Sequence, residues 1–188
     1  MYSRLSAMDH LIGRPVPCEQ STEVGVIEMI DGAVLVLVVA TAAACGLMAG
    51  AFYAFSSFVM QGLERLPAEG GIAAMQSINV TAVTPPFTLG LFGTAAGCVA
   101  VAIVAVTDFD HPAAVYLLSG SILYLVGVVV LTASYHVPRN NALAVVAPAS
   151  ADGAAYWRTH LSQWTRWNHV RALTASAAVA LILGTRIG

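Results

Sequence analysis

Long uncharged stretches dominate the pattern of polar and apolar positions along the chain. No charged residue occurs between Asp31 and Glu64 or between Glu69 and Asp108. A membrane-spanning helix needs roughly 20 consecutive apolar residues, so stretches of this length are typical of membrane spans. The pattern predicts four spans, at about 32–62, 86–107, 112–135 and 164–186.

Four apolar blocks of this kind favour helices over a membrane barrel, whose strands would be about ten residues long with alternating polarity. We therefore expect an all-α fold, an integral membrane four-helix bundle that crosses the cell membrane several times. Residues 29–188 would form this domain. Residues 1–28, which contain Pro15 and Pro17, would form an irregular or peripheral N-terminal arm. Pro138 should end the third span near residue 135, because proline lacks an N–H group and disfavours helix at the preceding residue.

Composition supports a membrane location. Of the 188 residues, 58% are hydrophobic and 10% are charged, whereas soluble domains carry about a quarter charged residues. The net charge of −2 gives no reason to expect a nucleic-acid partner. The three cysteines show no ligand spacing, and no cysteine-bound metal is expected.

Polar and aromatic residues gather on the side of the bundle that carries the two long loops, 63–85 and 136–163. At the start of the fourth span, Trp164, Asn168 and Arg171 recur at helical spacing and share one face, while His169 lies about 100° around the helix from Asn168. Charged and strongly polar groups at this depth usually face the bundle or a wet cavity. The sequence therefore predicts a ligand pocket at the end of the bundle that carries the two long loops.

Two simpler interpretations stay open. Aromatic residues form belts at membrane interfaces, and arginines extend toward headgroups. A metal is another alternative: His136 and His169 could hold copper or iron, although no two histidines stand at the spacing of a helical metal pair. The small residues at positions 42, 46, 50 and 54, and Gly93 with Gly97, are interpreted as helix-packing positions.

Four segments within about 45–175 carry a resemblance to a known family. They read "GLMAGAFYAFSSFVMQGLERLP", "AMQSIN", "HVPRNNALA" and "WTRWNHVRALTA". In order and spacing they resemble the anthrone oxygenase-like family of small four-helix membrane proteins. That family often has asparagine before the Val-Pro pair, where this chain has His136, which could add a second base or a metal ligand.

The resemblance implies an integral membrane oxidoreductase, an oxygenase or monooxygenase that oxidises an apolar phenolic or quinol-type substrate with O2. Its cofactor is not defined: none, copper or iron would fit. His169 would be the base that removes a proton from the substrate. The residues with implied catalytic roles are His169, Arg171, Asn140 and Asn141. The residues with implied substrate contacts are Trp164, Trp167, Asn168, Tyr135, Tyr53 and Asn79.

A different class of function also fits these residues. The chain could be a non-enzymatic membrane module that binds a lipid or a hydrophobic aromatic molecule. It could equally be a homo-oligomer or an accessory subunit of a membrane complex, with the small-residue row of the first span as its contact surface. The two classes differ in whether the polar pocket performs chemistry.

Overall fold

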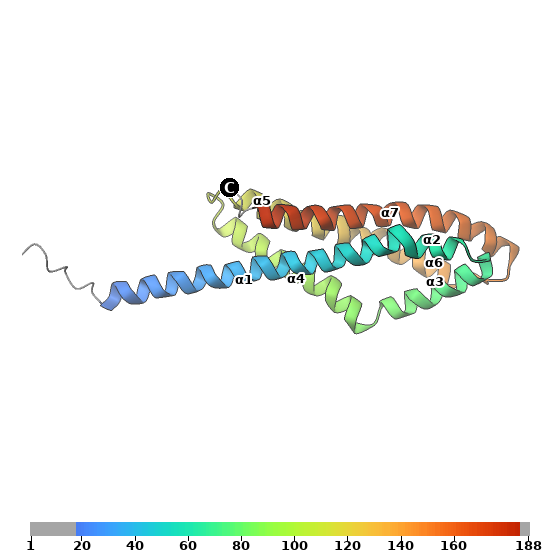
Figure 1. Ribbon diagram of the computed structural model, residues 1–188, viewed down its shortest axis with the longest axis horizontal. Helices are drawn as coiled ribbons and strands as arrows, with labels where there is room; N and C mark the ends of the chain where they lie inside the picture. The colour runs from blue at the N-terminus through green and yellow to red at the C-terminus, as the bar shows by residue number, and fades with distance from the viewer. Residues whose placement is uncertain (1–17, 185–188) are drawn as a thin grey trace, which may run out of the picture. The chain divides into compact units, whose positions relative to one another are not determined.

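The chain folds as helices (Figure 1). The computed structural model describes the backbone of residues 18–184 and the side chains of residues 32–183, and no strand occurs among them. The elements are α1 (Cys18–Ala54), η1 (Phe55–Val59), α2 (Met60–Glu64), α3 (Ala68–Ala82), α4 (Pro85–Thr107), α5 (Ala114–Tyr124), η2 (Leu125–Val130), η3 (Thr132–His136), α6 (Val137–Ala144) and α7 (Ala151–Gly184). The three η segments are π-helical. The all-α prediction is confirmed.

Three helical stretches are long and apolar enough to cross a membrane. They are Gly32–Glu64, Pro85–Thr107 and Ala114–Ala144. Residues 164–184 of the predicted fourth span belong to α7, which does not reach the same hydropathy over its described residues, and residues 185–186 lie outside the described part of the chain. Its central turns carry Asn168, His169 and Arg171, which lower the mean hydropathy of that segment. A fourth crossing therefore stays a prediction.

The N-terminal helix is longer than the sequence predicted. α1 begins at Cys18, so residues 18–28 are helical and do not form the irregular arm expected for 1–28; residues 1–17 lie outside the described part. No proline follows Pro17 in this segment, so nothing in it prevents a helix from starting directly after that residue. The chain forms two structural units, with the boundary after Leu35. The helical residues 18–35 belong to the first unit, and the compact second unit begins at Val36.

The third span continues through Pro138, which the sequence predicted as its end. Val137 keeps helical angles (φ −60°, ψ −49°), and the helix runs on to Ala144. The reason lies in the π-helical turn directly before the proline. The Val137 N–H donates to the Thr132 carbonyl, five residues back, so the hydrogen-bond register has already shifted where Pro138 lacks its donor. The predicted end at residue 135 is wrong for this reason.

A sharp bend joins α3 to α4 (Figure 1). Pro85 and Pro86 occupy the first positions of α4, where their missing N–H groups cost nothing. Thr84, which precedes them, is extended (φ −74°, ψ 159°), as residues before proline tend to be. The Thr84 hydroxyl donates to the Thr81 carbonyl at 2.6 Å and closes the end of α3. The two prolines thus fix the position of the bend.

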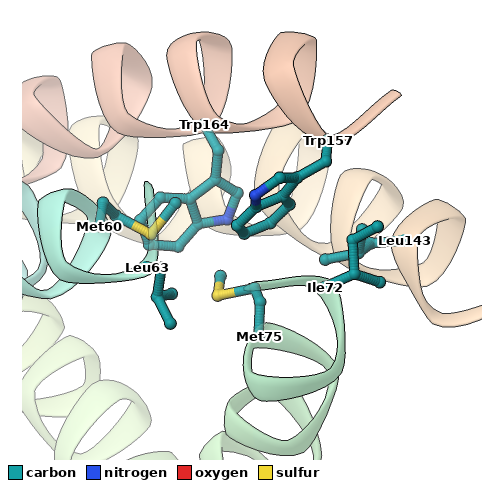
Figure 2. Close-up of a cluster of buried hydrophobic side chains, with 7 residues drawn as sticks. All are labelled: Met60, Leu63, Ile72, Met75, Leu143, Trp157 and Trp164. Carbon is teal, nitrogen blue, oxygen red and sulfur yellow. The ribbon is translucent and has the colours of Figure 1, made fainter. Parts of the chain in front are cut away.

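Buried side chains of α2, α3, α6 and α7 form one hydrophobic cluster (Figure 2). Its buried members are Met60, Leu63, Ile72, Met75, Leu143, Trp157 and Trp164. Both indoles point from α7 toward α3, and Gly71 of α3 lies directly against the ring of Trp157. Two tryptophans that could have formed an interfacial belt are therefore the largest side chains of this core.

The small residues of the first span and of α4 allow close helix packing at one position. A side chain added at Gly97 of α4 would lie 2.7 Å from the Thr41 hydroxyl of α1, so the two helices approach closely there. Gly50 and Gly93 have open space instead. Tight helix packing is therefore confirmed at Gly97 and does not extend along both rows.

Gly71→Ala should destabilise the fold. The new methyl group would lie 2.8 to 3.0 Å from three atoms of the Trp157 ring, and overpacking of this kind costs about 1–3 kcal/mol. The neighbouring variant Gly70→Ala is the matched control, because its methyl group meets only Leu66 Cβ at 3.8 Å. Since alanine is the better helix former by about 1 kcal/mol, this control should keep or raise stability. Thermal unfolding in detergent micelles measures both, and equal melting temperatures would contradict the packing assigned to Trp157.

Candidate functional site

A cavity of about 760 Å³ lies within the compact unit. Its walls come from the end of α1 with η1, the second half of α3, the first turns of α4, the η2–η3–α6 segment and α7. Most of the lining is apolar and includes four phenylalanines, Phe52, Phe55, Phe87 and Phe92. Large apolar cavities with a few convergent polar groups are typical of small-molecule sites. The polar side chains with nitrogen in its wall are Asn79, His136, Asn140, Asn168 and Arg171.

Asn168 ties α7 to the first span. Its Nδ2 group donates to the Phe52 carbonyl and to Ser56 Oγ, both at 2.7 Å. Its Oδ1 atom accepts from Arg171 Nη2 at 2.6 Å. Arg171 Nη1 donates to Thr132 Oγ1 at 3.2 Å, which connects the network to the third span. The Asn168 amide therefore links the arginine to the first span, and Thr132 links it to the third.

Arg171 is a buried cation without an acidic partner. Only 5% of its surface is exposed, and no carboxylate among the described residues pairs with it. Its guanidinium carbon lies 4.5 Å from the Phe52 ring centroid and 5.3 Å from that of Trp164, where cation–π attraction offsets part of the cost of burial. Its Nε atom is buried and has no hydrogen-bond partner. The wall of the cavity thus contains a buried positive charge.

His136 is the second unusual polar group in the wall. It is 1% exposed and lies edge-on to Trp164, with ring centroids 5.2 Å apart. The carbonyls of Leu131 and Trp164 lie near the imidazole, but neither ring nitrogen reaches hydrogen-bond geometry with any group. A buried polar group left unpaired costs about 1–3 kcal/mol. A ligand in the cavity that bonds to this ring would recover that free energy.

Two asparagines complete the polar lining. Asn140 accepts a hydrogen bond from Trp164 Nε1 at 2.9 Å, which fixes its amide oxygen and leaves its NH2 group as a donor. Asn79 of α3 has a buried Nδ2 atom without a partner. The unpaired groups of the cavity wall are therefore mostly hydrogen-bond donors, an arrangement suited to an oxygen-rich or anionic ligand.

π-helical turns flank the cavity on two spans. Phe55 belongs to η1, and Thr132, Ala133 and His136 belong to η3. Such turns are rare and occur frequently at functional sites, because the extra residue re-aims side chains within a helix. Here η3 places Thr132 and His136 on the same wall as Arg171.

The structure separates the predicted site residues into two groups. Arg171, Asn140, Trp164, Asn168, Asn79 and His136 line the cavity. His169, Asn141, Trp167, Tyr53 and Tyr135 do not. Thr132, which bonds to Arg171, was missed; its position one turn before His136 is the signal that could have indicated it.

His169, the predicted base, is exposed on the outer face of α7. With Trp164, Asn168 and Arg171 directed inward, a step of 100° per residue turns position 169 away from the cavity. Tyr135 and Trp167 also lie outside it, with ring centroids 5.2 Å apart and Arg139 over the Tyr135 ring. These placements differ from the prediction because neighbouring residues of a helix face different directions.

The described part of the chain contains no cluster of residues that could bind the copper or iron considered as an alternative. The side chains of residues 32–183 include no group of three or more His, Cys, Asp or Glu residues arranged to hold an ion. The two histidines proposed as ligands do not converge, since His136 faces the cavity and His169 is exposed.

Apolar helices of membrane-spanning length define the chain as an α-helical membrane protein, and the cavity with Arg171 in its wall is its candidate site. A family model described as anthrone oxygenase matches residues 87–181, more than half of the chain. The chain belongs to that family, as the sequence motifs indicated. No curated protein and no solved structure matches it. The matched segment includes His136, Asn140, Asn168 and Arg171.

His160 forms a separate buried site on α7, outside the predicted spans. Its ring stacks on Trp157 with centroids 5.7 Å apart and planes 16° from parallel, and neither nitrogen has a hydrogen-bond partner. Burial, and to a smaller extent the positive charge of Arg139, lowers the pKa of His160 from 6.5 to about 4. The imidazole is therefore neutral in the folded protein at pH 7.

This pKa predicts that the fold loses stability as the pH falls from 6.5 toward 4. In that window the unfolded chain binds a proton at His160 that the folded protein does not bind, which costs the fold about 2 kcal/mol between about pH 7.5 and about pH 5. His160→Phe should remove that part of the pH dependence. Thermal unfolding at the two pH values measures it, with His169→Phe, at an exposed position of the same helix, as the control. An unchanged pH dependence in His160→Phe would contradict the assignment.

Proposed function

We propose that the protein is a membrane oxygenase that oxidises a flat, phenolic, anthrone-type substrate with O2 in this cavity. One observation carries the proposal: Arg171 is a buried cation that no carboxylate among the described residues pairs with, in the wall of an apolar cavity, beside a histidine that has no hydrogen-bond partner among them. A site of this kind stabilises an anion better than a neutral molecule, and an anthrone becomes reactive toward O2 when it loses a proton and forms an enolate.

The chemistry requires a base and an anion site. His136 is the base in this proposal, because it lines the cavity and has no competing hydrogen bond. It accepts a proton from the methylene carbon of the substrate, and the charge moves to the substrate oxygen. Arg171 and the NH2 group of Asn140 are the donors proposed for that oxygen. Asn168 acts through Arg171 as a positioning residue, since its own NH2 group is fully used.

The oxidation then needs only O2 as co-reactant. The enolate transfers one electron to O2, and the resulting pair of radicals joins to form a C–O bond. The peroxide formed takes up a proton, for which protonated His136 is the nearest donor. Loss of the remaining C–H proton, with cleavage of the O–O bond, releases water and leaves a carbonyl group. In sum, the methylene group and one O2 molecule become a carbonyl group and one water molecule, which converts an anthrone to a quinone.

The walls of the cavity suit a flat aromatic substrate. Phe52 and Phe87 are edge-on, with centroids 6.4 Å apart, and Phe55 is tilted against Trp164 at 5.9 Å. Such rings bury an apolar ring system and hold it in one plane. The volume of about 760 Å³ falls within the range typical of small-molecule sites, roughly 300–1,000 Å³.

His136→Gln should lower kcat by about 10²–10⁴-fold, the usual contribution of a general base. Glutamine keeps a polar side chain of similar length but cannot accept and release the proton. Oxygen uptake by purified protein with 1,8-dihydroxyanthrone measures the effect. His169→Gln is the control and should retain wild-type activity, because His169 is exposed and outside the cavity. Full activity of His136→Gln would show that a hydrogen-bonding amide suffices and that His136 is not the base.

Arg171→Gln should weaken the binding of an ionised phenol more than that of its neutral form. The probe is 1,8-dihydroxyanthraquinone, added below and above its first phenol pKa and followed by quenching of tryptophan fluorescence. The wild-type protein should prefer the anion by about tenfold or more, the usual size of a desolvated charge contact, and the variant should lose that preference. Arg166→Gln, at an exposed position on α7, is the control. Binding without turnover in the wild type would instead support the non-enzymatic module.

A further inference from the structure

Where α4 and the η3–α6 segment line the mouth of the cavity, the exposed side chains are apolar, whereas on the α3 side the hydroxyl residues Ser77, Thr81 and Thr84 are exposed too. Val83, Phe92 and Val137 all line the cavity, and their exposed fractions are 73%, 60% and 45%. Val83 lies at the bend between α3 and α4, Phe92 on α4 and Val137 at the start of α6. A mouth that opened to water would leave this apolar surface in contact with water, at about 25 cal/mol for each Å². A mouth that opens to lipid carries no such cost.

The positions of these residues along the spans agree with a lipid-facing mouth. Phe92 is seven residues from the start of α4, and Val137 is seven residues from the end of the third span at Ala144. At 1.5 Å per residue, each lies about 10 Å along its helix from the same side of the bundle. Exposed apolar residues one to two turns inside a membrane-spanning helix are expected to contact the acyl chains.

Polarity changes from the mouth to the interior. The part of the rim between α4 and the η3–α6 segment is apolar, whereas Arg171 and His136 in the wall are almost fully buried. A molecule that enters from the mouth therefore passes from a hydrocarbon-like surface to a positive charge. This order suits an amphipathic ligand that partitions into the bilayer and carries one ionisable oxygen.

We propose that the ligand reaches the cavity sideways from the bilayer, through the mouth between the first turns of α4 and the η3–α6 segment. The ligand class is a flat aromatic molecule dissolved in the membrane, with an acidic hydroxyl group that Arg171 binds. The inference rests on the proposed function for the identity of the substrate, but the route itself depends only on the geometry of the cavity.

Bulky residues at the mouth should slow both entry and exit of the ligand. Val137→Phe and Ala133→Phe each enlarge an exposed side chain that lines the cavity. Val130→Phe is the matched control, because Val130 is equally lipid-facing on the same span but does not line the cavity. The protein is placed in phosphatidylcholine nanodiscs and mixed with 1,8-dihydroxyanthraquinone, and quenching of tryptophan fluorescence is followed by stopped flow. Partition of the probe into lipid is the same for all variants.

Association and dissociation rates should fall together by about tenfold or more in the two mouth variants, with Kd nearly unchanged, because an obstacle on the route alters both rates equally. The control should match the wild type. Equal rates in all variants would overturn the route, as would a changed Kd at constant association rate. Anthraquinone-2-sulfonate, which stays in water, should associate far more slowly than the probe; equally fast association would show entry from water and overturn the proposal.

The two proposals fail separately in this design. A wild-type protein that binds the probe through the mouth but consumes no oxygen with the anthrone loses the oxygenase function and keeps the route. A protein that oxidises the anthrone, with identical rates in the mouth and control variants, keeps the function and loses the route. Failure of the wild type to bind the probe would overturn the inferred ligand class.

Discussion

The arrangement of the site follows from one constraint, the burial of the Arg171 charge where no carboxylate of residues 32–183 pairs with it. Moving such a charge out of water costs several kcal/mol even after the protein relaxes around it. The chain reduces that cost with neutral partners: the Asn168 amide, the Thr132 hydroxyl and the faces of Phe52 and Trp164. None of these neutralises the charge. The wall of the cavity therefore keeps a positive potential that an anionic ligand or reaction intermediate can complete.

The π-helical turns η1 and η3 place the groups that surround the buried Arg171 charge. The η1 turn lies beside the Phe52 carbonyl and contains the Ser56 hydroxyl, the two groups that receive the Asn168 amide. The η3 turn brings Thr132 and His136 to the cavity and shifts the register before Pro138. A π-helical turn costs stability, so two spans that carry such turns beside one cavity favour a functional explanation over a packing defect.

Trp164 connects the stability of the fold to the geometry of the site. One side of its indole belongs to the hydrophobic cluster with Met75 and Leu143, and its Nε1 group orients Asn140 at the cavity. Its ring also faces His136 and the Arg171 guanidinium. Changes in the core between α3 and α7 will therefore alter the site as well.

The sequence by itself determined the all-helical membrane fold, the first two spans and the shared face of Trp164, Asn168 and Arg171, because hydropathy and helical periodicity are local properties. Its motifs also indicated the family. Only the tertiary structure decided which histidine faces the cavity, since His136 and His169 look alike in the sequence and differ in the direction that their helices give them. The continuation of the third span through Pro138 depended on a hydrogen-bond register five residues long, which no residue type specifies. That no carboxylate within the described part of the chain pairs with Arg171 could be seen only once distant segments were placed together.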